Sequence, residues 1–92
     1  MGKVMREFGQ LQSLQKLNLV NNRLIILPKE IGQLQNLQKL DLKGNRLTTL
    51  SDEIGQLKNL QKLYLIDNQL SLEEREKIRK LLPKSKIIFE VY

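Results

Sequence analysis

The chain contains one 13-residue phrase three times, and this repetition restricts the folds available to it. The copies are EFGQLQSLQKLNL at residues 7–19, EIGQLQNLQKLDL at 30–42 and EIGQLKNLQKLYL at 53–65, so the interval between copies is constant. A repeat of about 20 to 50 residues is typical of solenoids, in which each unit buries its apolar side chains against its neighbours. We therefore expect the copies to lie side by side as successive coils.

Each copy predicts one strand and one bend. The pattern L-x-L places two leucines on the same face of a strand, because successive side chains alternate between two faces. An asparagine follows shortly after, where a buried amide can donate to and accept from backbone groups at the bend. The next segment loses the alternation and contains Pro28, which indicates an irregular or 3₁₀ segment. These positions are Leu17, Leu19 and Asn22, then Leu40, Leu42 and Asn45, then Leu63, Leu65 and Asn68.

The unit L-x-x-L-x-L-x-x-N-x-L resembles the leucine-rich repeat, and residues 4–70 resemble the 23-residue repeats of bacterial, particularly spirochaetal, proteins of that family. The resemblance implies an α/β fold: a short solenoid with a parallel concave sheet and an irregular or 3₁₀ convex side. In related bacterial proteins the repeat serves protein–protein recognition, including contact with host molecules. The resemblance therefore implies a protein partner, and a host protein is among the partners that it admits.

Residues 71–92 do not repeat the phrase and predict a C-terminal cap. Ser71 and Glu74 form a capping-box pattern, and Pro83 ends the helix at or before the residue that precedes it. The apolar face of this helix consists of Ile78, Leu81 and Leu82. The segment KIIFEVY, which begins one repeat period after Leu63, predicts a last strand that extends the sheet. We expect residues 1–92 to form a single domain.

The composition argues against catalysis and against membrane insertion. The chain has no Cys and no His, and no catalytic, phosphate-binding or metal-binding motif, so we expect no enzyme, cofactor or metal. No apolar stretch approaches the ~18–20 residues that span a bilayer, and no secretory signal is visible. This favours a cytoplasmic location by default and leaves secretion without a signal open. The net charge of +6 admits nucleic acid or another acidic partner.

The strand residues that alternate with the leucines are the candidates for partner binding. We assign Lys16, Asn18, Lys39, Asp41, Lys62, Tyr64 and Ile66 to this concave face. Three lysines in one column repel one another, which favours an acidic protein, phosphate or glycan as ligand; the alternative is that repeat duplication copied a solvated lysine. Tyr64 and Ile66 suit an interface, although single exposed apolar residues are also common without one.

The N-terminal end of the repeats lacks a cap in the sequence. Residues 4–14 supply only half a coil, so we expect the strand around Leu17 and Leu19 to be a free edge. Ile25 and Ile26 replace the threonine pair of the next repeat and favour self-association at this end. The alternative is that these two isoleucines pack beneath the N-terminal half coil.

Two further readings of function compete with protein recognition. In one, the lysine column holds a polyanion, either nucleic acid or a sulfated glycan. The sequence counts against this hypothesis, because acidic residues interrupt the basic positions and few aromatics are available to stack bases, and we do not expect nucleic acid as the partner. In the other, the chain is a repeat fragment or an engineered consensus-like protein with no ligand of its own. The leading hypothesis is a non-enzymatic protein-interaction module that binds through its concave face and self-associates.

Overall fold

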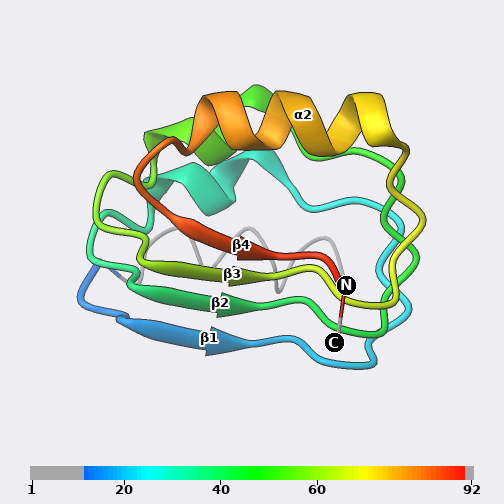
Figure 1. Cartoon of the computed structure of the whole chain (residues 1–92). Coiled ribbons are helices and arrows are strands. Elements are labelled where there is room, and N and C mark those ends of the chain that lie inside the picture. The colour runs from blue at the N-terminus through cyan, green and yellow to red at the C-terminus, as the bar shows by residue number, and fades with distance from the viewer. Residues whose placement is uncertain (1–11, 91–92) are drawn as a thin grey trace.

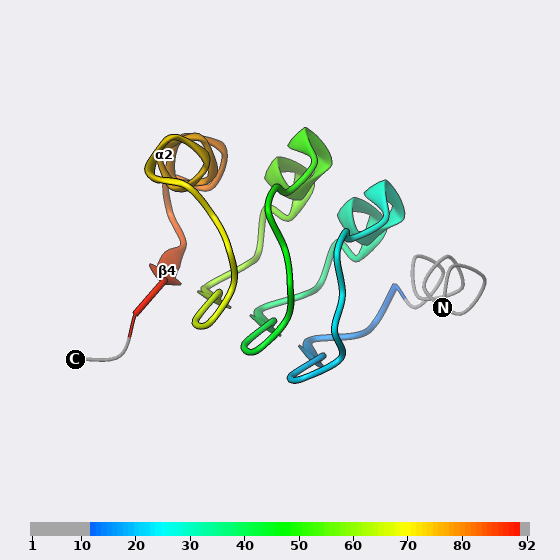
Figure 2. The same cartoon turned by 90° about the vertical axis from the view of Figure 1, so that its right-hand side faces the viewer.

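The computed structural model describes residues 12–90, and these residues form a stack of coils. One edge of each coil contributes a strand to a parallel sheet in chain order: β1 (Lys16–Asn18), β2 (Lys39–Asp41), β3 (Lys62–Tyr64) and β4 (Lys86–Ile88) (Figure 1). The opposite edge carries the 3₁₀ helices η1 (Lys29–Gln33) and η2 (Asp52–Gln56), followed by the helix α2 (Leu72–Leu81). Seen along the strands, the coils lie side by side with the strands on one edge and the helices on the other (Figure 2). The predicted leucine-rich-repeat solenoid is confirmed.

The register of the sheet follows the repeat between the first three strands and departs from it at the last. Lys16 lies opposite Lys39, and Lys39 opposite Lys62, so each step equals one repeat period. Lys86 lies opposite Lys62, which makes the last step one residue longer than a period. The alignment of KIIFEVY one period after Leu63 is therefore wrong by one position, because Ile87 and not Lys86 takes the inward place beside that leucine. An inward lysine would bury an unpaired charge, which is costly.

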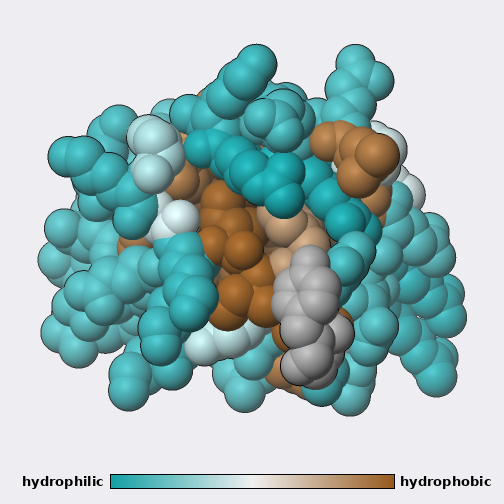
Figure 3. All heavy atoms as spheres, viewed as in Figure 1, coloured by the Kyte–Doolittle hydropathy of each residue, from teal (hydrophilic) through white to brown (hydrophobic). Residues whose placement is uncertain are grey.

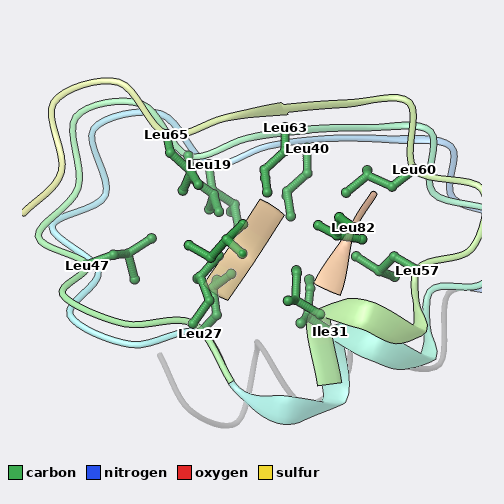
Figure 4. Close-up of a cluster of buried hydrophobic side chains, with 14 of the residues drawn as sticks. Leu19, Leu27, Ile31, Leu40, Leu47, Leu57, Leu60, Leu63, Leu65 and Leu82 are labelled. Atoms are coloured by element: carbon green, nitrogen blue, oxygen red, sulfur yellow. The ribbon is translucent and has the colours of Figure 1, made fainter. Parts of the chain in front are cut away.

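Leucine and isoleucine side chains from both edges of the coils fill the space between the sheet and the helices (Figure 4). The repeated leucines of the second and third strands are almost inaccessible, with Leu40 and Leu63 at 0% exposure. Leu17, one coil nearer the N-terminus, is only partly buried. The difference follows from the stacking, because a middle coil is covered on both sides.

Asparagines occupy both bends of the coils. Asn45 is 5% exposed and bonds five backbone groups: Oδ1 accepts from the N–H of Asn22 and of Leu24, and Nδ2 donates to the carbonyls of Leu19, Leu42 and Lys43. This confirms the predicted role for Asn45, and the half-buried Asn68 likewise bonds the N–H of Leu47 and the carbonyl of Leu42. The prediction is wrong for Asn22, which is exposed, and its side chain donates to the carbonyl of Val20 in its own coil. Sequence reasoning missed a second ladder at the bend that enters each strand. Its members donate to the preceding coil: Asn36 to the carbonyl of Gln12, Asn59 to that of Gln35 and Ser85 to that of Leu60.

The C-terminal helix and strand are both present. The Ser71 side chain accepts a hydrogen bond of 3.1 Å from the N–H of Glu74, as the capping pattern predicts. α2 ends at Leu81, and it packs Ile78 into the core at 0% exposure. The half coil predicted at residues 4–14 lies mostly outside the described residues.

Candidate binding surface

The concave face consists of the outward side chains of the four strands and of the residues that follow them. One column contains Lys16, Lys39, Lys62 and Lys86, the next contains Asn18, Asp41, Tyr64 and Ile88, and Val20, Lys43 and Ile66 come after the first three strands. The structure thus brings together all seven residues that the sequence assigned to partner binding. It adds Lys86 and Ile88, which the sequence missed because the last coil is one residue longer than a repeat.

The four lysines of the first column have no ion pair within residues 12–90. The ion pairs of the same region use cations of α2 instead: Arg75 with Glu90 at 3.0 Å, Lys77 with Glu74 at 2.8 Å, and Arg79 with Glu76 at 3.3 Å. Neighbouring strands lie ~4.8 Å apart, so the lysine column concentrates like charge along one line. Lys39 turns across the column, and its Nζ lies 6.0 Å from the centre of the Tyr64 ring.

Two of the predicted contact residues have a structural task. Asn18 Oδ1 accepts from the N–H of Val20 at 3.0 Å, and Asp41 Oδ1 accepts from the N–H of Lys43 at 3.1 Å. These local bonds close the turn after each strand, as Asn and Asp side chains commonly do. Tyr64 occupies the same position in β3 without such a bond among the described residues. Tyr64, Ile66 and Ile88 are all half-buried, and they make the C-terminal half of the concave face the more apolar half.

The concave face is hollowed over its N-terminal strands. A shallow depression of about 300 Å³ is lined by Lys16, Leu17, Asn18, Lys39, Asp41 and Tyr64. Its walls combine positive charge, one carboxylate and one aromatic ring. A depression this open suits a side chain or short segment of a larger ligand better than an enclosed small molecule.

The residues assigned to self-association lie in different environments. Ile25 and Ile26 are each 65% exposed, so the structure does not show them packed beneath another segment. Leu19 is 8% exposed and belongs to the core, and its N–H donates to the carbonyl of Asp41 in β2. The N–H and carbonyl groups of successive residues point to opposite sides of a strand. Since the leucines direct these groups toward β2, the backbone groups that point away from β2 are those of Lys16 and Asn18.

A second hollow, of about 520 Å³, lies between α2 and β4 at the C-terminal end of the stack. Figure 3 shows apolar residues gathered in the middle of this end and surrounded by hydrophilic ones. The guanidinium carbons of Arg75 and Arg79 lie 5.2 Å and 5.0 Å from the centre of the Phe89 ring. Cation–π contacts and the ion pair to Glu90 thus hold the helix against the strand. No sequence pattern indicated this arrangement.

One strand per coil, a parallel sheet in chain order and asparagines at the bends define a repeat solenoid with an exposed strand face. A family model for the leucine rich repeat matches residues 12–70, and the chain belongs to the leucine-rich-repeat family. Such proteins are typically non-enzymatic and typically mediate protein–protein interaction. Among residues 12–90 there is no helix with the length and apolar character needed to span a bilayer.

The chain is similar to a solved structure of the leucine-rich-repeat protein LIC12759 of Leptospira interrogans. The two are 58% identical over 91% of this chain, with a TM-score of 0.89, which confirms the bacterial repeat type predicted from the sequence. The chain spans about a fifth of that protein, since the match covers 21% of its length. No curated protein sequence matches the chain.

Proposed function

We propose that this chain is a non-enzymatic recognition module that binds a protein partner through its concave face. The observation that carries the proposal is the row of four lysines without ion pairs, within residues 12–90, beside the apolar residues Tyr64, Ile66 and Ile88. Exposed charge that no internal partner neutralises, next to an aromatic anchor, is typical of protein-binding surfaces.

The size of the concave face limits its affinity. Four strands at ~4.8 Å span about 15 Å across the sheet, whereas a standard interface buries ~800 Å² on each partner. We therefore expect a single copy to bind weakly. Higher affinity would require further contacts outside the four strands or two copies acting together.

Selection from a displayed peptide library against the immobilised protein tests this proposal. Peptides that bind the wild type should lose binding to the double variant Lys62→Glu, Tyr64→Ala, because it reverses one charge and removes the aromatic ring. Lys58→Glu is the matched control, because Lys58 is exposed on the helical side and undergoes the same charge reversal. Peptides that bind the double variant as tightly as the wild type would refute the concave-face assignment. A selection that yields no binder would favour the reading of a repeat fragment without a ligand.

The second candidate function is binding of a polyanion, a nucleic acid or a sulfated glycan, by the same lysines. The absence of ion pairs at these lysines within residues 12–90 favours it. A polyanion should lose affinity steeply with salt, because binding releases counterions in proportion to the charges neutralised. Heparin affinity that changes little between low and high NaCl concentration would remove this candidate.

We further infer that the chain self-associates through its N-terminal end, supported by the exposure of Ile25 and Ile26. Two neighbouring apolar side chains of this exposure gain free energy when a second copy covers them. Light scattering over a concentration series should show a mass increase that Ile25→Thr, Ile26→Thr removes. These substitutions copy the Thr48 and Thr49 of the next coil and so preserve the turn. A wild-type protein that stays monomeric at millimolar concentration contradicts the inference.

A further inference from the structure

We propose that the concave face recognises the acidic side of an α-helix that lies across the strands, with its axis along the lysine column. The proposal rests on the proposed function, because it specifies which element of a protein partner occupies the same face. It follows from the charge, the spacing and the apolar residues of that face.

The charge of the face requires an acidic ligand. The column of Lys16, Lys39, Lys62 and Lys86 has no ion pair within residues 12–90, and Asp41 is the only carboxylate among the strand residues beside it. The Asp41 carboxylate accepts a hydrogen bond from the N–H of Lys43. A ligand that places one carboxylate opposite each lysine would relieve the repulsion along the whole column.

The spacing of the column favours a helix over an extended segment. Three intervals of ~4.8 Å span about 14 Å between the outer strands. In a helix, residues i, i+4, i+7 and i+11 form one stripe over about 16 Å, at about 1.5 Å per residue, and so offer four carboxylates to four lysines. In an extended segment, side chains on the same face recur every ~6.7 Å, so only three carboxylates fit the same span. The flexible lysine stems can absorb the remaining ~2 Å.

The apolar residues specify what lies beside the acidic stripe. Tyr64 and Ile88 are neighbours in the second column, in register across β3 and β4, and both are half-buried. The corresponding positions of β1 and β2 are Asn18 and Asp41, whose side chains bond the following turn. The partner helix should therefore carry an apolar residue next to one end of its acidic stripe. The single aromatic ring among these positions provides one stacking surface, fewer than a nucleic acid strand uses.

Three synthetic peptides test the proposal by fluorescence anisotropy at physiological salt concentration. The stripe peptide is an Ala-based 18-mer with Glu at i, i+4, i+7 and i+11 and Leu beside the last Glu. The permuted peptide has the same composition with the Glu residues spread around the helix. The interrupted peptide is the stripe peptide with a central Pro, which breaks the helix. The stripe peptide should bind about tenfold more tightly than either of the others, since each exposed ion pair contributes up to about 1 kcal/mol.

Charge-removing variants identify the lysines involved. Lys62→Gln and Lys86→Gln should each weaken binding of the stripe peptide about threefold, whereas Lys58→Gln on the helical side should leave it unchanged. Equal binding of the stripe and permuted peptides, or equal effects of the Lys58 and Lys62 variants, would mean unspecific attraction and overturn the proposal. Equal binding of the interrupted peptide would mean an extended ligand and overturn it as well.

The remaining outcomes separate this inference from the proposed function. If the stripe peptide fails to bind but displayed peptides bind in a Tyr64-dependent way, the concave face binds protein and the helix proposal is wrong. If the stripe peptide fails and a heparin oligosaccharide binds in a Lys62- and Lys86-dependent way, the ligand is a polyanion and the proposal is also wrong. Binding of neither peptide class nor heparin would refute both the inference and the proposed function.

Discussion

At the scale of single residues, the coils are joined by side chains that satisfy backbone groups of the neighbouring coil. Asn45 shows the effect most clearly, because one buried amide bonds five backbone groups on two coils. Its counterpart Asn22, at the N-terminal side, is exposed, and its side chain donates to the carbonyl of Val20. The same residue type at the same repeat position therefore contributes differently, according to how far it is buried.

Replacing Asn45 should destabilise the fold far more than replacing Asn22. Asn45→Ala would leave buried N–H and carbonyl groups without partners, and each such group costs about 1–3 kcal/mol. We expect a loss of about 3 kcal/mol in the free energy of unfolding, measured by urea denaturation. Asn22→Ala is the control and should cost less than about 1 kcal/mol, because water can replace its exposed bond. Equal losses for the two variants would contradict this account of the bend.

Glu74 links α2 to the preceding coil through its carboxylate. Oε1 lies 2.8 Å from Lys77 Nζ and accepts a hydrogen bond of 2.7 Å from Thr49 Oγ1. These two hydrogen bonds, with that of Lys77 the larger effect, lower the pKa of Glu74 below its ordinary value of 4.5. A lowered pKa in the folded state means that the stabilisation is complete above about pH 4.5 and is lost as the pH falls through the folded-state value.

The Glu74→Gln variant should therefore be less stable than the wild type at pH 7, by about 1 kcal/mol. The difference should shrink as the pH falls below 4.5 and vanish once the carboxyl group is protonated in both states. Thermal unfolding between pH 2.5 and pH 7 measures it. Glu73→Gln is the matched control, since Glu73 lies in the same helical turn and is exposed. A pH dependence that Glu73→Gln removes equally would show that the helix terminus, and not this contact, is responsible.

At the scale of elements, the helical side of the stack depends on small residues where successive segments touch. A methyl group on Gly32 of η1 would lie 2.6 Å from the carbonyl oxygen of Glu53 in η2. One coil further on, a methyl group on Gly55 would lie 3.3 Å from the carbonyl oxygen of Leu81 in α2. The first contact is impossible without moving backbone, whereas the second needs a shift of a few tenths of an ångström.

Gly32→Ala should therefore destabilise the protein more than Gly55→Ala. We expect about 2–3 kcal/mol for the first, as for other overpacked sites, and less than about 1 kcal/mol for the second. Chemical denaturation of both variants provides the comparison. The ranking depends on contacts between segments, so a reversed order would mean that α2 packs more tightly on η2 than η2 does on η1.

At the scale of the whole molecule, each coil contacts only its neighbours, and the helix and last strand complete the core of the third coil. Ile78 from α2 is fully buried in the same cluster as Leu40 and Leu63 from the sheet. We infer from this shared core that the repeats within residues 12–70 and the helix and strand within residues 71–90 unfold as one domain. About three repeats are also the minimum for a stable solenoid. We therefore expect that the remaining coils cannot stay folded once one coil has opened.

Native-state hydrogen exchange tests this inference. The N–H of Leu42 bonds the carbonyl of Tyr64 in the sheet, and the N–H of Leu82 bonds that of Ile78 at the end of the helix. Ile78→Val should lower the opening free energy of both amides by the same amount, about 1 kcal/mol. Loss of protection at Leu82 alone would show that the cap opens independently of the repeats.

The sequence predicted the buried leucines and Asn45 because a fixed period repeats both the residue type and its environment. It missed Lys86 because α2 replaces the helical side of the last coil and adds one residue, so the period no longer indicates which side chains face inward. The assignment of Asn18 and Asp41 to partner binding did not consider that each side chain accepts a hydrogen bond from the N–H two residues further along the chain. This bond is a local preference of Asn and Asp side chains and was recognisable from the sequence.

The exposure of Ile25 and Ile26 was not predictable, since whether a segment covers them depends on tertiary packing and not on the local pattern. The second asparagine ladder did have a signal, because Asn36 and Asn59 recur at the repeat period. Polar residues at that position are equally compatible with a solvated turn, and only the hydrogen bonds to the preceding coil distinguish the two cases.

The extra residue in the register between β3 and β4 has a consequence for how such a chain can grow. The extra residue lies in the segment that contains α2, so a further repeat inserted anywhere before α2 would leave the register of β4 unchanged, whereas one inserted between α2 and β4 would separate the helix from the strand that it packs against. Whole repeats can thus be added before α2 without changing the C-terminal helix and strand. Each added repeat would lengthen the lysine row by one charge and about 4.8 Å, so genetic duplication could match the row to longer partners with the same C-terminal helix and strand.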